Sequence, residues 1–87
     1  MDRYSLQVRP SVRKDVEAIP QKELKKILAR MEGLRENPRP PTSMKLSGLE
    51  YYRIRQGDYR IVYEIDDPHS IALVAKIAHR RDVYKKR

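Results

Sequence analysis

Three arginines lie close together in YYRIRQGDYRIVY, residues 51–63, at positions from which they could bind an anion. A Gly-Asp pair separates two alternating runs rich in Tyr, Ile and Val, which predicts a β-hairpin with a two-residue turn. Folding the segment about that turn pairs Arg55 with Arg60 and puts Arg53 on the same face. Like charges that face each other destabilise a sheet, unless Glu64 and other carboxylates dilute the repulsion on a solvated face. The clustering favours a site that receives negative charge.

The opposite face of this hairpin is apolar. Tyr52 and Ile54 alternate with the arginines of the first strand, and Ile61 and Tyr63 do the same on the second strand. Because successive residues of a strand point to opposite faces, these four side chains predict the core side of a sheet. The segment SIALVAKIA, residues 70–78, is apolar at almost every position and predicts a central strand covered on both faces.

The residues before the hairpin predict one strand and two helices. RYSLQVRP, residues 3–10, alternates like a strand and ends at a proline. Ser11 is suited to cap a short helix, and a proline at position 20 separates this helix from a longer one. NPRPPTS, residues 37–43, has no period and predicts a surface connection back to the sheet. The apolar positions are Val12, Val16 and Ile19 in the first helix, and Leu24, Ile27, Leu28, Met31 and Leu34 in the second.

The order of these elements predicts an α+β fold in a single domain that spans residues 1–87. The N-terminal strand joins the hairpin and the last strand in a small, mostly antiparallel four-stranded sheet. The helical hairpin packs on one face of the sheet, and a short C-terminal basic tail or helix, HRRDVYKKR, follows the last strand. Two helices can cover only one face, so the face that carries Arg53, Arg55 and Arg60 is expected to be open.

The composition favours a small globular protein with an anionic partner. The 87 residues carry a net charge of +8, which is typical of proteins that bind nucleic acid, anionic lipid or an acidic protein. The absence of cysteine excludes disulfides, thiol nucleophiles and cysteine-bound metals. MDRYSLQVRP lacks an apolar signal core, and no apolar run reaches the roughly 18 residues that cross a bilayer. These features are typical of a cytoplasmic protein without a membrane segment.

Two segments, taken together, resemble a known protein family. KLSGLEYYRIRQGDYRIVYEI, residues 45–65, and IALVAKIAHRRDVY, residues 71–84, resemble the RelE/ParE superfamily of bacterial and archaeal toxins, and most closely its RelE branch. The expected order of elements matches that superfamily over essentially the whole chain. The resemblance implies a toxin of a type II toxin-antitoxin system, an endoribonuclease that cleaves mRNA in the ribosomal A site. It implies neither a metal ion nor another cofactor.

The resemblance also implies which residues would act. In that family a basic patch on the sheet and a tyrosine near the C-terminus hold and cleave the message. Arg53 and Arg55 take the place of two basic strand residues that are often lysines, and Arg60 matches the arginine of the next strand. The resemblance assigns Arg53, Arg55, Arg60, Arg81 and Tyr84 to the catalytic site, with Arg80 and His79 as further candidates. The expected RNA-binding residues are Lys45, Arg53, Arg55, Lys85 and Lys86. Lys85 and Lys86 belong to a basic tail that either frays or attracts RNA phosphates.

RNA cleavage without a metal ion needs a base for the ribose 2′-hydroxyl, positive charge on the phosphorane and an acid for the departing 5′-oxygen. Arginine suits the second task because its planar fork binds two phosphate oxygens and keeps its charge. No pair of carboxylates or histidines stands out as the base. Histidine ordinarily titrates near neutrality, so His79 is either a proton-transfer group or an ordinary exposed histidine. Tyr84 could stack on a nucleobase or orient the 2′-hydroxyl, or it could pack within a terminal turn.

The implied partners are an antitoxin, the ribosome and mRNA. A cognate, acidic, RelB-like antitoxin is expected to wrap the toxin, and operator DNA is expected to be bound only through their complex. No membrane partner is expected. Two alternatives compete with the nuclease: a ParE-like inhibitor of DNA gyrase that acts by binding, and a non-catalytic module that binds RNA or the ribosome. The basic cluster together with Tyr84 favours the nuclease over the gyrase inhibitor, whereas the missing base favours the binding module.

Overall fold

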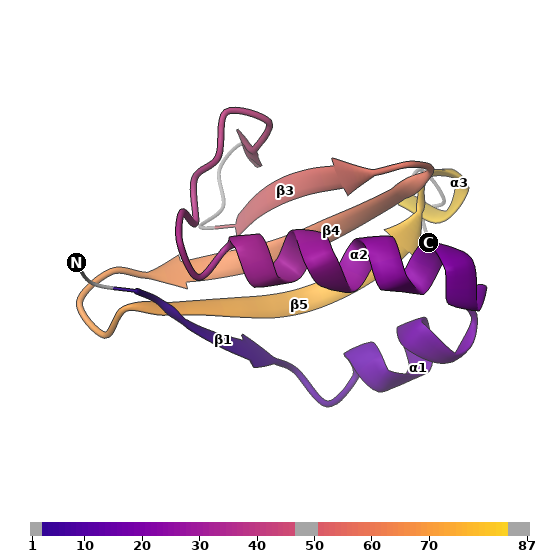
Figure 1. Cartoon of the computed structure of the whole chain (residues 1–87), viewed down its shortest axis with the longest axis horizontal. Helices are drawn as coiled ribbons and strands as arrows, with labels where there is room; N and C mark the ends of the chain where they lie inside the picture. The colour runs from indigo at the N-terminus through magenta and orange to yellow at the C-terminus, as the bar shows by residue number, and fades with distance from the viewer. Residues whose placement is uncertain (1–2, 47–50, 84–87) are drawn as a thin grey trace.

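The computed structural model describes residues 3–46 and 51–83 and shows a five-stranded mixed sheet with two helices on one face (Figure 1). The strand order is β1-β5-β4-β3-β2, with β1 parallel to β5 and the other neighbours antiparallel. The elements are β1 (Ser5–Val8), α1 (Val12–Glu17), α2 (Gln21–Gly33), β2 (Met44–Lys45), β3 (Tyr51–Gln56), β4 (Tyr59–Asp66), β5 (Ile71–His79) and α3 (Arg80–Val83). No helix within these ranges is long and apolar enough to cross a membrane.

The predicted α+β fold is confirmed, with one strand more than expected. The additional strand is β2, whose two residues pair with Arg53 and Tyr52 of β3. The sequence before the hairpin was interpreted only as a lead into it, since two residues are too few to show a period. The short helix α3 is the C-terminal element that was expected as a tail or a helix.

The β3-β4 hairpin has the predicted register at every pair. Gln56 lies opposite Tyr59, Arg55 opposite Arg60, and the pairing continues to the tyrosines at positions 52 and 63. Gly57 has a φ of 61°, in the left-handed region that glycine adopts without strain. Glycine in the first turn position is the signature of a type II′ turn, whose twist matches that of the strands.

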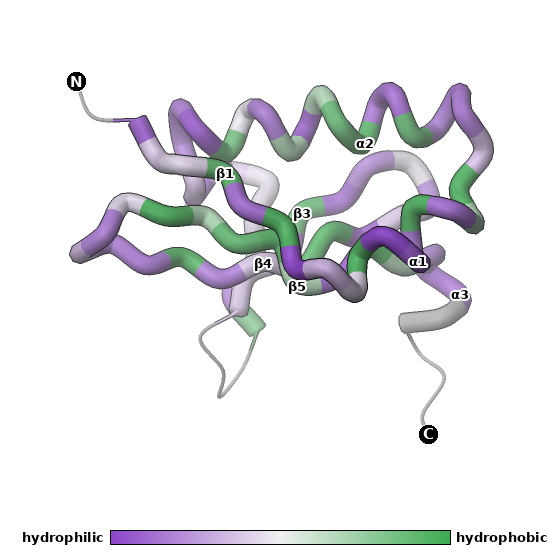
Figure 2. Tube along the Cα trace, turned by 90° about the horizontal axis from the view of Figure 1, so that it is seen from below, coloured by the Kyte–Doolittle hydropathy of each residue, from purple (hydrophilic) through white to green (hydrophobic). Residues whose placement is uncertain are grey.

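The hydrophobic core lies between the sheet and the two longer helices. Ile54, Ile61 and Tyr63 are buried on the helix-facing side of the hairpin, as predicted, and Figure 2 shows apolar turns of α2 toward the sheet. Leu28 was expected in the same stripe but is 45% exposed. At about 100° per residue, Leu28 lies roughly 90° from the centre of the buried stripe, beyond the reach of the sheet. The helices and the residues next to their ends contribute Val12, Ile19, Ile27, Met31 and Leu34 to the core.

Helix α1 is hydrogen-bonded to β5 near the C-terminal end of that strand. The carboxylate of Asp15 accepts a hydrogen bond from the backbone N–H of Ile77 at 3.1 Å and another from Lys76 Nζ at 3.2 Å. The pairing of β4 with β5 shifts register between Val62 and Tyr63 in this region. Asp15 therefore holds the irregular part of β5 that leads into its last residues.

The hydroxyl of Tyr63 ties the proline-rich connection to the sheet. It donates a 2.6 Å hydrogen bond to the carbonyl oxygen of Pro38, and both residues are buried. Burial raises the pKa of Tyr63 to about 12, so the hydroxyl keeps the proton that it donates. This bond fixes the path of the chain between α2 and β2.

Changing Tyr63 to phenylalanine is expected to lower the free energy of unfolding by about 1–2 kcal/mol, because the buried Pro38 carbonyl loses its donor. Urea unfolding of the two proteins measures the difference. Tyr51→Phe is the matched control, since the half-buried Tyr51 hydroxyl makes no hydrogen bond within residues 3–46 and 51–83. Equal losses in the two variants would contradict the assigned role of Tyr63.

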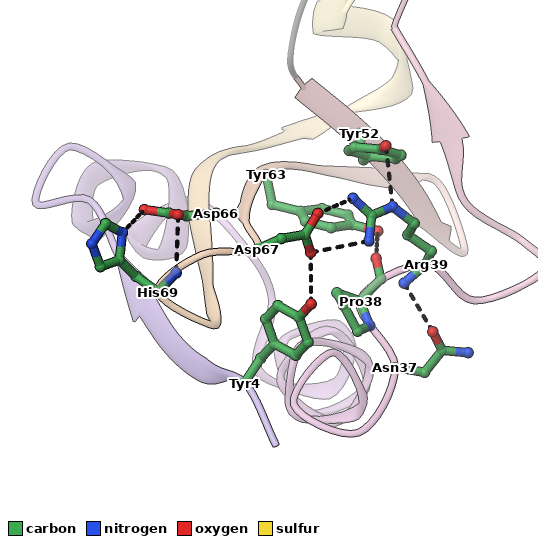
Figure 3. Close-up of polar contacts among 9 residues, drawn as sticks. All are labelled: Tyr4, Asn37, Pro38, Arg39, Tyr52, Tyr63, Asp66, Asp67 and His69. Atoms are coloured by element: carbon green, nitrogen blue, oxygen red, sulfur yellow. Dashed lines mark hydrogen bonds and ion pairs between the residues drawn. The ribbon is translucent and has the colours of Figure 1, made fainter. Parts of the chain in front are cut away.

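A polar network holds the end of the sheet at which β4 turns into β5 (Figure 3). The Asp67 carboxylate accepts hydrogen bonds from Arg39 at 2.9 and 3.3 Å and from the Tyr4 hydroxyl at 2.6 Å. The hydrogen bond from Arg39, and to a smaller extent the one from Tyr4, holds the pKa of Asp67 below its usual range. Arg39 Nε also donates to the Tyr52 hydroxyl at 3.2 Å. The network joins the start of β1, the 37–43 connection and β3, and leaves the other end of the sheet for the candidate site.

Candidate functional site

A concave site of about 790 Å³ lies at the end of the sheet where the β3-β4 turn meets the last residue of β5 and α3. We name it the turn hollow. It brings together four residues that the sequence singled out, three arginines and a histidine, and adds one carboxylate. Its lining residues are Asp58, Arg60, His79, Arg80 and Arg81.

Backbone contacts explain why these residues meet. Tyr59 pairs with His79 and Arg60 with Ala78, so the end of β5 lies beside the start of β4. The backbone N–H of Arg80 then donates a 2.6 Å hydrogen bond to the carbonyl oxygen of Asp58 in the turn. This bond holds the start of α3 against the hairpin turn, 22 positions earlier in the chain.

Arg60 departs from the expected open face. Its register places it on the face opposite the core, as predicted, but it is only 6% exposed. Here α3 packs against β4 and β5, and Arg80 and Arg81 lie around the same hollow as Arg60, so this end of the sheet is not open. Because an arginine keeps its charge when buried, Arg60 supplies fixed positive charge at the base of the turn hollow.

The imidazole of His79 is held by contacts on two sides. Its Nδ1 accepts a 3.1 Å hydrogen bond from the backbone N–H of Arg81, and its ring stacks edge-on against Tyr59 with centroids 5.2 Å apart. A nitrogen that accepts an N–H carries no proton, so the neutral ring has its proton on Nε2. His79 can therefore offer Nε2–H as a donor to a ligand in the turn hollow.

Arg53 and Arg55 line a second concavity of about 390 Å³ at the outer edge of β3. We name it the edge hollow; its other lining residues are Arg30, Thr42 and Met44. The hairpin arginines are thus divided between two hollows, although Arg55 lies directly opposite Arg60. Lys45 pairs with Tyr52, so the register places it on the face opposite Arg53.

Two charged lining residues were not recognised as site residues from the sequence. Asp58 was used only as a turn signal, although turn residues next to two strand ends are well placed for function. Arg30 lies on α2 outside its apolar stripe, and no signal in the sequence relates it to β3. Glu64, which would dilute the arginine repulsion in the alternative of a solvated face, forms an ion pair with Arg9. Tyr84, Lys85 and Lys86 lie outside the described residues.

The turn hollow thus lies on a basic α+β domain whose two longer helices cover one face of the sheet. A family model described as the ParE toxin of type II toxin-antitoxin systems matches residues 6–84. The chain belongs to this RelE/ParE family of type II toxin-antitoxin toxins.

Its relatives include archaeal and bacterial proteins named RelE. RelE1 of Methanocaldococcus jannaschii is 30% identical in an alignment 87 positions long, which covers 95% of this chain and 97% of the relative. The archaeal RelE-RelB complex from Pyrococcus horikoshii superposes with a TM-score of 0.79 at 25% identity, covering 88% of this chain and 94% of the other. The RelBE2 toxin-antitoxin complex of Mycobacterium tuberculosis gives 0.80 at 23% identity, covering 90% and 99%. The last of these comparisons shows the fold alone.

Proposed function

We propose that this toxin is a metal-independent endoribonuclease that cleaves mRNA in the ribosomal A site and so stops translation. One observation carries the proposal: the turn hollow gathers three arginines, a histidine and a carboxylate around one space large enough for a phosphodiester. Positive charge, a proton acceptor and an N–H donor are what attack by a 2′-hydroxyl requires.

The arginines stabilise the charge that develops on the phosphate. As the ribose 2′-oxygen attacks, the phosphorus becomes five-coordinate and its equatorial oxygens gain negative charge. Arg60 is buried and therefore preorganised, whereas Arg80 and Arg81 are exposed at the rim and can approach the substrate. Planar guanidinium groups donate two parallel hydrogen bonds to such oxygens. Arg53 and Arg55 hold the neighbouring RNA backbone, and Tyr84 has the proposed role of stacking on a nucleobase.

Asp58 is the proposed proton acceptor, since it is the carboxylate that lines the turn hollow. It takes the proton of the 2′-hydroxyl, the 2′-oxygen bonds to phosphorus, and the bond from phosphorus to the 5′-oxygen breaks. The products are a 2′,3′-cyclic phosphate and a 5′-hydroxyl, whose proton comes from water. His79 Nε2–H donates a hydrogen bond to the departing oxygen.

Two variants distinguish the roles of the two ring nitrogens of His79. A glutamine amide can place a donor near the position of Nε2, whereas an asparagine amide can place an acceptor near Nδ1. His79→Gln is expected to retain more cleavage activity than His79→Asn, because Nδ1 already accepts the backbone N–H of Arg81 and Nε2 is the nitrogen proposed to contact RNA. Single-turnover cleavage on ribosomes measures both. The reverse order would mean that His79 acts by holding the backbone of Arg81.

The proposed partners follow from the relatives. The proteins from P. horikoshii and M. tuberculosis were solved as RelE-RelB and RelBE2 complexes, and we propose that an acidic RelB-like antitoxin likewise wraps this chain. A net charge of +8 favours such a partner. Operator DNA would be bound through that complex. The setting of the proposed reaction is the cytoplasm, where ribosomes and messages meet.

Primer-extension mapping of one mRNA tests the proposed function. The message is incubated with the toxin either naked or on ribosomes with an empty A site. Cleavage within the A-site codon on ribosomes alone is the expected result, because the ribosome supplies the positioning that this small site lacks. An intact message in both samples would refute the nuclease.

Inhibition of DNA gyrase is the second candidate, because the matching family model is described as the ParE toxin. A DNA supercoiling assay with purified gyrase tests it. Inhibition without any cut in mRNA would replace the nuclease by this function. A toxin that binds ribosomes but neither cuts mRNA nor inhibits gyrase would be the non-catalytic module.

A further inference from the structure

The edge hollow is a site for negative charge that is separate from the turn hollow. The described residues that line it are five, of which three are arginines, Arg30, Arg53 and Arg55, and none is a carboxylate. Within residues 3–46 and 51–83, none of these three arginines forms an ion pair. The Arg53 guanidinium lies 2.9 Å from the thioether sulfur of Met44, which leaves its charge unneutralised.

Arg30 joins this hollow because the outer edge of β3 is only partly covered. β2 pairs with Tyr52 and Arg53, and no strand in the part of the chain that the structure describes continues along the edge beyond them. Arg30 reaches this gap from α2, and its Nη2 donates a 2.9 Å hydrogen bond to the carbonyl oxygen of Arg55. Its buried Nε makes no hydrogen bond within the described ranges. The backbone of β3 thus anchors a guanidinium from the helix layer beside two from the sheet.

The two hollows lie on either side of one cross-strand pair. The carbonyl of Arg55 points away from β4, since Arg30 binds it, and such residues form the non-hydrogen-bonded pairs of an antiparallel ladder. In these pairs the Cα atoms are about 4.5 Å apart. The side chains of Arg55 and Arg60 therefore start close together and diverge into different hollows. A chain with a phosphate at every repeat can occupy both hollows at once.

We infer that the edge hollow binds a second phosphodiester of the same single-stranded RNA that enters the turn hollow, with Arg30 as a binding residue. The inference rests on the proposed function for the identity of the strand, but its test measures binding and not cleavage. Guanidinium groups from two layers of the fold can contact a phosphate from different directions, which a flat basic surface cannot do. Arg30 would fix the register of the RNA, and so which phosphate lies among the arginines of the turn hollow.

The experiment is a binding titration with a short single-stranded RNA whose 2′-hydroxyls are methylated, so that it cannot be cut. The wild-type protein is compared with Arg30→Gln and with Lys26→Gln, which removes the same charge from an exposed position of α2. Arg30→Gln is expected to weaken binding about tenfold and to reduce the salt slope by about 0.7, the value for one phosphate of a single strand. Arg30→Lys, which can still reach the Arg55 carbonyl, is expected to be intermediate.

A neutral methylphosphonate placed at each position of the RNA in turn identifies the phosphate. At one position the methylphosphonate is expected to weaken RNA binding by the wild-type protein but not by Arg30→Gln, because this variant has already lost the contact with that phosphate. Equal effects of Arg30→Gln and Lys26→Gln, or no binding by the wild-type protein, would overturn the inference.

Arg30→Gln could instead lose binding to ribosomes while every methylphosphonate position weakens its RNA binding as much as it weakens that of the wild type. This result would assign the phosphate to ribosomal RNA and would also overturn the inference. If one phosphate position depends on Arg30 but the protein never cuts mRNA, the edge hollow binds RNA and the proposed nuclease function is refuted.

Discussion

Arg60→Ala is expected to slow single-turnover cleavage of mRNA on ribosomes by about 10²–10³-fold, the usual cost of removing one preorganised donor from a developing negative charge. The effect is large because Arg60 is buried and directed into the turn hollow by its place on β4. A surface arginine would have to be ordered during the reaction, whereas Arg60 is already in place.

Burial also makes Arg60 part of the packing, so the experiment needs a second variant. Arg60→Lys keeps the charge and most of the side chain but loses the planar fork, and a smaller decrease of about tenfold is expected. Arg13→Ala, at an exposed position of α1, removes the same charge and should leave cleavage unchanged. Full activity of a folded Arg60→Ala protein, with melting temperature as the check, would show that Arg60 does not stabilise the transition state.

Asp58→Asn is expected to reduce the same rate by about 10²–10⁴-fold, the usual contribution of a general base. The change is nearly isosteric, and asparagine is at home in turns. The contact that positions α3 is made by the backbone carbonyl of Asp58, so the substitution leaves it in place. The loss should therefore appear in the rate at saturating ribosomes and not in the affinity.

A matched control for Asp58→Asn is Glu17→Gln, which removes a carboxylate from an exposed position of α1. Removing negative charge from a basic protein should tighten RNA binding slightly in both variants. Only Asp58→Asn should lose cleavage. If both variants cleave like the wild type, another group accepts the proton and Asp58 is only a turn residue.

The hairpin was predictable because its determinants are local. A glycine in the first turn position and a period of two decide the register, and the register decides that Tyr63 faces the core while Arg60 does not. The buried face of α2 was predictable in the same way from its helical period. The prediction for Leu28 was wrong because the sheet covers a narrower face of the helix than the apolar stripe occupies.

The arrangement of the site could not be predicted because it depends on contacts between distant segments. Arg60 is buried where α3 meets β4, and the bond from the Arg80 N–H to the Asp58 carbonyl holds α3 at this place. The role of Asp58 as a lining residue follows from the same bond. Arg30 reaches the Arg55 carbonyl because β2 begins only at Met44, opposite Arg53, and the start of so short a strand carries no sequence signal.

The parallel pairing of β1 with β5 sets the order in which the molecule can be completed during synthesis. Ser5 lies opposite Ile71, so β1 leaves the ribosome early and waits for nearly all of the chain before it gains its partner. Pairings between distant segments form slowly. The turn hollow shares this dependence, because β5 and α3 supply His79, Arg80 and Arg81. A nascent copy therefore presents no assembled site to the ribosome that is making it.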